Sequence, residues 1–278
     1  MPTRPATVCT NYKKMRTIVL VSLLTTVFGL CRAKEIREDW IKNDSVFINI
    51  LKDAYLSNPT SIEKHLEPWE IKRENLGYGY SMIEHSVGKG YISIFYTLIY
   101  KDKKLVSFKL TPQMPNDSRL YSRYLSFYEG LFVNDNCQTK SLFYGYKFAS
   151  APINNSDKRF EISEKFEFFM TPYSGIIYGD AGGIASEPLE NRELFNSLKC
   201  SLNDVLLIHI LKSINPATRL YAAEMYLTQK DSFKEKKIIE ELIEMNFKEL
   251  PEIITMSGCI QYSDDARKVL KEMIEIRK

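Results

Sequence analysis

The sequence has few of the residues from which metal and catalytic sites are usually built. It contains 3 histidines and 5 cysteines among 278 residues. No two cysteines are spaced as Cys-x-x-Cys, and none is grouped with histidines. Since zinc sites are built from such groupings, the sequence predicts no bound metal.

Signatures of nucleotide binding are also missing. The glycine-rich stretch over residues 179–186, GDAGGIAS, lacks the Gly-Lys-Ser/Thr ending of a phosphate-binding loop and the GxGxxG spacing of a dinucleotide site. Its composition is typical of a flexible linker or a tight double turn. The sequence therefore predicts no cofactor.

Long apolar runs are limited to the first 33 residues, which resemble an export signal. Three basic residues within positions 13–16 precede an uncharged, largely apolar run over residues 18–30. This run is shorter than the ~20 residues of an ordinary membrane span. The small side chains of Cys31 and Ala33 predict cleavage after Ala33. Residues 1–33 are therefore interpreted as a signal peptide.

Two alternatives for this leader stay open. Cys31 could carry a lipid, although Leu30 precedes it where lipoprotein signals have a small residue. The apolar run could also remain uncleaved as an anchor. In each case the membrane is reached only through the leader or a lipid.

Excess positive charge is absent once the leader is removed. The chain has 38 bases and 35 acids, and five bases but no acid lie in residues 1–33. The remainder has 38 − 5 = 33 bases against 35 acids, a net charge of −2. A nucleic-acid-binding surface would need concentrated positive charge, so no nucleic-acid partner is expected.

The remaining chain predicts an α+β domain over residues 34–185. A helical segment runs from residue 34 to 69, with a cap at Asp44-Ser45 and an apolar stripe consisting of Val46, Phe47, Ile50, Leu51 and Ala54. An antiparallel sheet rich in aromatic residues follows. Its clearest part is a hairpin at residues 91–110, with further strands expected at 141–150 and 160–170. Helical spacing at residues 119–131 predicts a helix across the sheet.

Residues 186–278 are predicted to form a helical subdomain. It follows a glycine-rich boundary segment whose backbone can adopt many conformations. Its clearest unit is a helical hairpin at residues 202–229, in which Asn215 caps the second helix and Pro216 takes its first position. The pattern then predicts a charged helix, a short helix from Pro251 to Gly258 and a last helix capped by residues 263–265. The expected apolar positions are Val205, Leu206, Ile208, Leu211 and Ile214 on the first helix of the hairpin, Leu220, Ala223, Tyr226 and Leu227 on the second, and Phe233, Ile238, Leu242 and Met245 on the charged helix.

This hairpin resembles the paired helices of HEAT-like repeats, because Asn215, Pro216, Arg219 and Ala223 occupy the corresponding places. The whole chain also resembles uncharacterised exported proteins of Bacteroidetes-type bacteria. A repeat array needs about three stacked units, and only one to two are present. The hairpin therefore predicts a docked helical subdomain.

No catalytic residue is assigned from the sequence. Glu84, His85 and Ser86 are adjacent on an expected strand and so point to opposite faces, which excludes a ready-made triad. His209 lies among apolar residues. Cys137, Cys200 and Cys259 remain after the leader, and Cys200 with Cys259 is the preferred pair if a disulfide forms.

The leading hypothesis is a non-enzymatic exported binding module, whose partner is another envelope protein or surface component, in the periplasm or cell envelope. One alternative is a hydrolase with a cleft between the sheet and the helical tail, suggested by the glycine-rich loop at the domain junction with Tyr173, Ser174 and Asp180 nearby. Another is a membrane-tethered lipoprotein anchored through Cys31.

Overall fold

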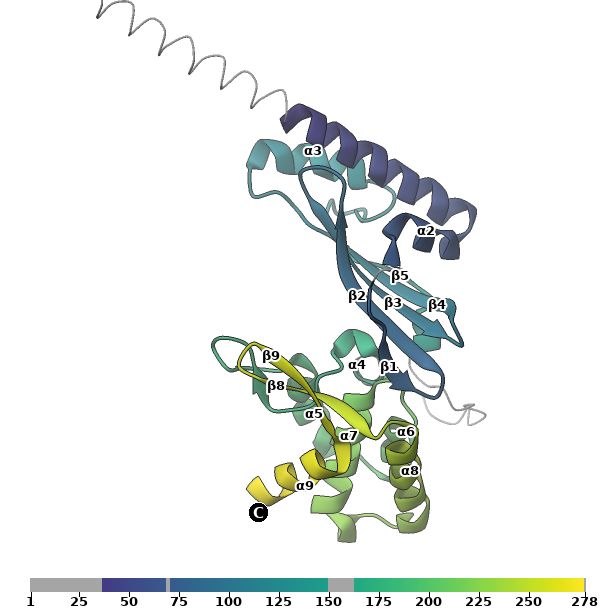
Figure 1. Ribbon diagram of the computed structural model, residues 1–278, viewed down its shortest axis with the longest axis vertical. Coiled ribbons are helices and arrows are strands. Elements are labelled where there is room, and N and C mark those ends of the chain that lie inside the picture. Colours follow the sequence, from purple (N-terminus) through teal and green to yellow (C-terminus); the bar gives the residue numbers. More distant parts are fainter. Residues whose placement is uncertain (1–36, 69–70, 150–162, 278) are drawn as a thin grey trace, which may run out of the picture.

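The computed structural model describes residues 37–68, 71–149 and 163–277 (Figure 1). The predicted signal peptide, the cleavage after Ala33 and the alternatives at Cys31 lie outside these residues. A sheet part covers residues 37–149, and a helical tail covers residues 163–277. The predicted α+β class is confirmed, with the sheet in the middle of the view and helices at both of its ends.

A five-stranded antiparallel sheet organises the sheet part. Its strands pair in chain order, namely β1 (Glu74–Gly77), β2 (Tyr80–Gly88), β3 (Ser93–Lys101), β4 (Lys104–Pro112) and β5 (Leu142–Tyr144). β3 and β4 confirm the predicted hairpin. The strand expected at 141–150 is only three residues long, and a 3-10 turn, η3 (Tyr146–Ala149), follows it.

Helices cover one face of this sheet. The first is helical over residues 37–57 and is followed by η1 (Pro59–Ile62) and α2 (Glu63–Leu66), while α3 (Ser118–Tyr128) confirms the helix predicted at 119–131. Ile83, Leu98 and Phe108 of the sheet are each at most 1% exposed beneath these helices and share one apolar core with them.

Two details of the first helix differ from the prediction. Asp44 and Ser45 do not cap it but lie inside it, and Asp44 is 2% exposed. Val46 and Ile50, expected in the apolar stripe, are 52% and 40% exposed, whereas Ile41 and Ile48 are buried. The predicted stripe is right at Phe47, Leu51 and Ala54, which are 7%, 0% and 7% exposed. The buried face also includes Ile41, Asp44 and Ile48, at helical spacing, which leaves Val46 and Ile50 outside it.

The segment at 160–170 is not a strand over its described residues. It forms α4 (Glu164–Met170), in which Phe166, Phe169 and Met170 are buried at the i, i+3, i+4 spacing of a helix. These side chains join the apolar core of the helical tail. That core therefore reaches back before residue 185, and the division into domains 34–185 and 186–278 stays a prediction.

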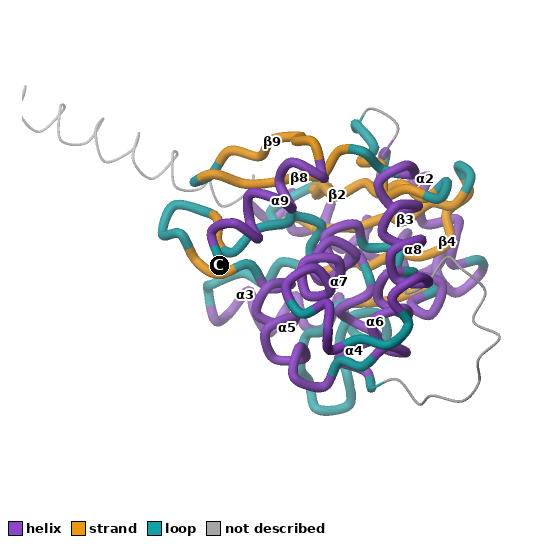
Figure 2. Tube along the Cα trace, turned by 90° about the horizontal axis from the view of Figure 1, so that it is seen from below, coloured by secondary structure: helices purple, strands orange, loops and turns teal. Residues whose placement is uncertain are grey.

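The predicted helical hairpin is confirmed as α6 (Asp204–Leu211) and α7 (Pro216–Thr228). The side-chain oxygen of Asn215 accepts hydrogen bonds from the backbone N–H groups of Ala217 and Thr218, at 3.0 and 3.4 Å. Every residue from 216 to 224 is buried, and Figure 2 shows α7 in the middle of the other helices. Two expected core positions are wrong, since Val205 and Leu227 are each 44% exposed.

The remaining elements of the tail surround α7. They are η4 (Pro172–Ser174), β6 (Ala181–Gly182), β7 (Glu187–Pro188), α5 (Glu190–Leu198), η5 (Lys199–Ser201), η6 (Lys230–Ser232), α8 (Lys236–Glu249), β8 (Glu252–Ser257), β9 (Ile260–Asp265) and α9 (Ala266–Ile276). None of the helices among the described residues has both the length and the apolar character needed to cross a membrane.

The helix predicted from Pro251 to Gly258 is wrong. Residues 252–265 form the β8–β9 hairpin, which turns at Gly258 with a φ of 56°. Consecutive β-branched residues over 253–255 favour a strand, and glycine accepts the positive φ of the turn. The predicted cap of the last helix is confirmed, because the Asp265 carboxylate accepts a hydrogen bond from the Lys268 backbone N–H at 2.8 Å.

A small third core joins the two parts. Its buried members are Leu76, Met82, Ile99, Tyr173, Ile176 and Ile214. Beside it, Arg219 of α7 donates a hydrogen bond to the backbone oxygen of Leu76 at 2.7 Å. Tyr78, in the turn between β1 and β2, donates its hydroxyl to Asn246 of α8 at 2.5 Å. The sheet and the tail are therefore linked by both apolar and polar contacts.

Candidate functional site

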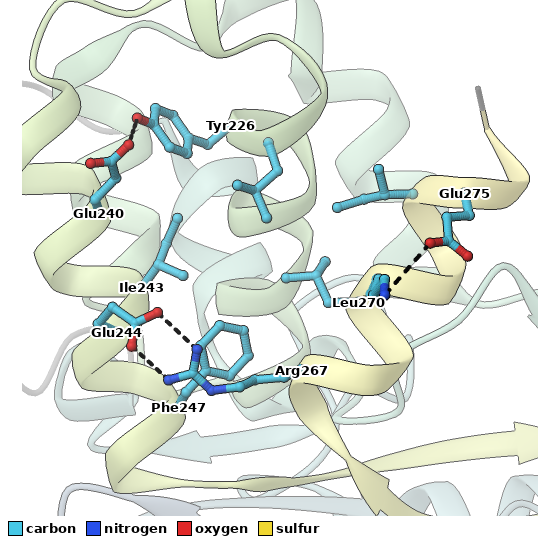
Figure 3. A pocket seen from close by; sticks show the side chains of 11 residues that line it. Tyr226, Glu240, Ile243, Glu244, Phe247, Arg267, Leu270 and Glu275 are labelled. Carbon is cyan, nitrogen blue, oxygen red and sulfur yellow. Dashed lines mark hydrogen bonds and ion pairs between the residues drawn. The ribbon is translucent and has the colours of Figure 1, made fainter.

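A groove with an apolar floor lies between α8 and α9, with the end of α7 at its base. We call it the α8–α9 groove; it has a volume of about 550 Å³. Its lining residues are Tyr226, Leu227, Glu240, Ile243, Glu244, Phe247, Arg267, Leu270, Lys271, Ile274 and Glu275. Figure 3 shows Ile243, Phe247 and Leu270 facing one another from the two helices.

The groove exists because α7 packs against both α8 and α9, which lie apart from each other above it. Ile243 and Phe247 are one helical turn apart on α8, and Leu270 and Ile274 are one turn apart on α9. Leu227, at the end of α7, remains 44% exposed. The result is an apolar strip between charged side chains of α8 and α9, in which Leu227 is exposed and the other apolar side chains are nearly covered.

The charged side chains at the rim differ between the two helices. α8 contributes Glu240 and Glu244, whereas α9 contributes Arg267, Lys271 and Glu275. Arg267 binds Glu244 across one end of the groove through two hydrogen bonds of 2.8 and 2.6 Å, and its guanidinium lies over the Phe247 ring at 4.4 Å. One lip is therefore acidic and the other mainly basic.

These contacts hold both carboxylates of α8 in their ionised form. Hydrogen bonds from Lys230 and Tyr226 lower the pKa of Glu240, and the bond from Arg267 lowers that of Glu244. In turn, burial and the bond to Glu240 raise the pKa of Tyr226 to about 12. At neutral pH the acidic lip is charged and Tyr226 is a neutral hydrogen-bond donor.

A second concavity lies where the alternative hypothesis expected a cleft, between the sheet and the tail. We call it the sheet–tail crevice; it has a volume of about 500 Å³. The sheet side contributes Ile71, Lys72, Glu74, Met82 and Glu84, and the tail side contributes Ser174–Ile177, Leu189–Asn191, Ile254 and Gln261. A smaller cavity of about 290 Å³ adjoins it, because both are lined by Lys72, Glu74, Ile176 and Ile254.

The residues expected for a hydrolase in this crevice have structural contacts. The Ser174 hydroxyl is buried and donates to the backbone oxygens of Phe169 or Thr171, at 3.1 and 2.9 Å. The Tyr173 hydroxyl lies 2.6 Å from the hydroxyl of Ser107. Only Ser174 of the three expected residues lines the crevice, so the arrangement does not bring them together.

Asp180 is exposed and instead lies at the edge of a group of charges in the tail, whose buried members are Arg192 and Glu224. Arg192 is 2% exposed and donates to both oxygens of Glu224, at 3.1 and 2.8 Å, and its Nε lies 3.0 Å from the Asp180 carboxylate. Arg277 contacts both acids, and Tyr178 donates its hydroxyl to Glu224 at 2.7 Å. This cluster fixes the glycine-rich stretch against α5, α7 and α9.

The other residues singled out from the sequence lie apart. His85 contacts the backbone oxygen of Ser86 at 2.7 Å and packs near Tyr96, so it forms no triad with Glu84 and Ser86. Burial lowers the pKa of His209, which lines neither concavity. Cys200 and Cys259 are exposed free thiols, so the preferred disulfide is absent. The described residues contain no group of acids, histidines or cysteines placed to bind a metal ion.

The sequence did not predict the α8–α9 groove, whereas the sheet–tail crevice lies where the alternative hypothesis placed a cleft. The stripe expected on α8 included Ile238 and Met245, which are 45% and 36% exposed, while the buried positions are Ile239, Leu242, Ile243, Asn246 and Phe247. The apolar residues of α8 and α9 were visible as helical stripes. That these two stripes would line the two sides of one groove could not be read from either stripe alone.

The chain was compared with models of protein families, with curated proteins and with solved structures, and none of the three comparisons found a match. The functional argument therefore rests on the geometry of the two concavities.

Proposed function

We propose that the chain is an exported, non-enzymatic interaction module of the cell envelope, which holds an amphipathic helix of a partner protein in the α8–α9 groove. The observation that carries the proposal is the apolar strip between an acidic and a basic lip. Helix-binding grooves recognise apolar side chains at i, i+3 or i+4 and i+7. Leu227, which is 44% exposed, would contact them directly. The groove floor beneath is formed by Ile243, Phe247, Leu270 and Ile274, each at most 9% exposed.

The packing of the tail supports a helix as the occupant. Helices in contact lie about 8–10 Å apart, and each buries an apolar stripe against its neighbours. α7 already contacts α8 and α9, so a further helix lying between them would complete the layer above α7.

The charges of the lips indicate what that helix carries. Basic side chains along one edge would face Glu240 and Glu244, and acidic side chains along the other would face Arg267 and Lys271. These contacts would replace the present pairs of Glu240 with Lys230, of Glu244 with Arg267 and of Lys271 with Glu275. This is the pattern by which flanking charges set the orientation of paired helices. The proposed partner segment is therefore apolar on one stripe and oppositely charged on its two edges.

The test is site-specific photo-crosslinking in cells that express the full chain. A photoreactive residue replaces Leu227 in one variant and Val205 in the matched control, because both side chains are 44% exposed and Val205 lies on α6, outside the groove. We expect a crosslink from position 227 to a partner segment with the helical apolar pattern. Leu227→Glu should weaken binding of that segment about tenfold or more.

Three outcomes would contradict the groove as the docking site. These are equal crosslinking from positions 227 and 205, a crosslinked segment without helical apolar spacing, or unchanged binding by the Leu227→Glu variant.

Export is tested separately by the intact mass of the mature protein, which should begin at Lys34. A mass that retains residues 1–33 would contradict the predicted cleavage, and release from the membrane by Cys31→Ala would instead support the lipoprotein alternative.

A further inference from the structure

We infer that the sheet–tail crevice is a separate binding site for an organic cation that carries an apolar group. Its volume of about 500 Å³ lies within the 300–1,000 Å³ typical of ligand pockets. Its two walls come from different parts of the fold, namely β1 and β2 of the sheet on one side and the tail on the other. Ligand sites occur preferentially at such junctions.

The walls provide the apolar contact. Met82 and Ile176 are 3% and 7% exposed and belong to the small core that joins the two parts. Ile177, Leu189 and Ile254 lie above them and are half-buried. An apolar group entering the crevice would remove water from these partly exposed side chains, which is favourable in proportion to the area covered.

The charge in the crevice favours a cation. Glu84 stands on the sheet wall and Glu190 on the tail wall, and neither forms an ion pair or hydrogen bond within the described parts of the chain. Glu74 is paired with Lys72 at 3.2 Å. Three acids against one base give the crevice a formal charge of 1 − 3 = −2.

The buried polar groups of the crevice are already hydrogen-bonded within the chain, so the recognition of a ligand does not depend on them. The Asn191 amide donates to the backbone oxygens of Gly175 and Ile177, at 3.0 and 2.8 Å, and its oxygen accepts from the Tyr221 hydroxyl. The Ser174 hydroxyl accepts from Asn215 at 3.1 Å in addition to its own donated bond. Recognition would therefore depend on charge and apolar contact.

The test is isothermal titration calorimetry of the full chain with octylammonium as the probe and octanoate as its oppositely charged match. We expect octylammonium to bind in a salt-dependent manner and octanoate to bind at least about tenfold more weakly. The Glu84→Gln, Glu190→Gln double variant should weaken octylammonium about tenfold, since each exposed carboxylate contributes modestly.

The matched control is the Glu193→Gln, Glu241→Gln double variant, which makes the same change in net charge at exposed acids outside the crevice. It should bind as the unaltered chain does. Equal binding of octanoate, unchanged binding by the crevice variant, or equal weakening by the control variant would each overturn the inference. Leu227→Glu should leave octylammonium binding unchanged, so this site and the α8–α9 groove are tested independently.

Discussion

The sheet part and the helical tail bury polar groups in different ways. In the sheet part the buried carboxylate of Asp44 accepts hydrogen bonds from the backbone N–H groups of Tyr91 and Ile92, at 2.7 and 3.1 Å, and from the Tyr124 hydroxyl at 2.5 Å. In the tail Arg192 and Glu224 are buried together as an ion pair.

The two parts therefore hold a chain segment in place by two different kinds of contact. Asp44 connects the first helix to the start of β3 and to α3 through neutral donors, whereas the tail fixes its glycine-rich stretch through paired charges. A buried pair is costly to break because removing one partner leaves the other charge desolvated. The tail should therefore respond more strongly to the loss of a single charged side chain than the sheet part does.

The largest expected effect tests whether the two parts are stable independently. Leu220 is 6% exposed in the core of the tail, so Leu220→Asp should lower the free energy of unfolding by more than about 4 kcal/mol. Because the third core and the Arg219 and Tyr78 contacts join the parts, the sheet should lose protection at the same time. Urea unfolding, with hydrogen exchange of the β3 amides as a second probe, measures both.

Leu56→Asp is the control for this variant, because Leu56 is 69% exposed on the first helix and its replacement should change stability by less than about 0.5 kcal/mol. Two separable transitions, with exchange from β3 unaffected in the Leu220→Asp variant, would show that the parts are independent domains.

The second prediction compares a buried and an exposed ion pair. Arg192→Met leaves Glu224 and Asp180 with only Arg277 as a basic partner and should destabilise the chain by about 3–5 kcal/mol. Arg123→Met removes the exposed pair with Glu38 in the sheet part and should cost less than about 1 kcal/mol. Chemical unfolding of both variants measures the difference, and equal losses would contradict the contrast drawn between the two parts.

The third prediction concerns the buried carboxylate of the sheet part. Asp44→Ala removes the acceptor of two backbone donors and one hydroxyl and should cost about 2–3 kcal/mol. Asp53→Ala, at an exposed position of the same helix, is the control. Thermal unfolding measures both, and a loss no larger than that of the control would show that Asp44 does not hold the helix to the sheet.

The smallest effect is a pH dependence in the tail. Burial, together with the charge of Lys212, lowers the folded-state pKa of His209 below its ordinary value of 6.5. The unfolded chain therefore binds this proton first, and stability should fall as pH decreases from about 6.5 through the lower folded pKa. His209→Gln should remove this slope and Lys212→Gln should reduce it. The measurement is a set of unfolding curves between pH 7.5 and 5. If the change in unfolding free energy with pH is the same in the His209→Gln variant, another group causes it.

Local patterns predicted much of the fold but not its surfaces. The Asn215-Pro216 start of α7, the β3–β4 hairpin and α3 each depend on caps, turns or spacing contained in a short stretch. α4 and the β8–β9 hairpin were assigned the wrong type. Short segments of mixed apolar and polar residues fit both the helical period of about 3.6 residues and the strand period of about 2. Packing in the tail decides which of the two structures each segment adopts.

The buried charges, the α8–α9 groove and the lining of the sheet–tail crevice could not be predicted, because they depend on residues far apart in the chain. Arg192 and Glu224 each read as ordinary polar positions on a helix, and only packing places them together, at 2.8 Å. Glu84 and Glu190 similarly line one crevice, although Glu84 belongs to the sheet part and Glu190 to the tail. Such groupings would need information on tertiary contacts that a single sequence does not contain.

The contacts beside the crevice also have a consequence for the order of folding. The strand pairs from β1 to β4 are between near neighbours in the chain, as are α6 and α7. In contrast, the hydrogen bonds of Arg219 to Leu76 and of Tyr78 to Asn246 join residues 143 and 168 positions apart. Contacts that close such long loops form after local ones. Closing the loop costs conformational entropy, and this cost comes before the contacts at its ends stabilise the chain. We therefore expect the two walls of the crevice to come together late in folding, after the sheet and the helices that border it.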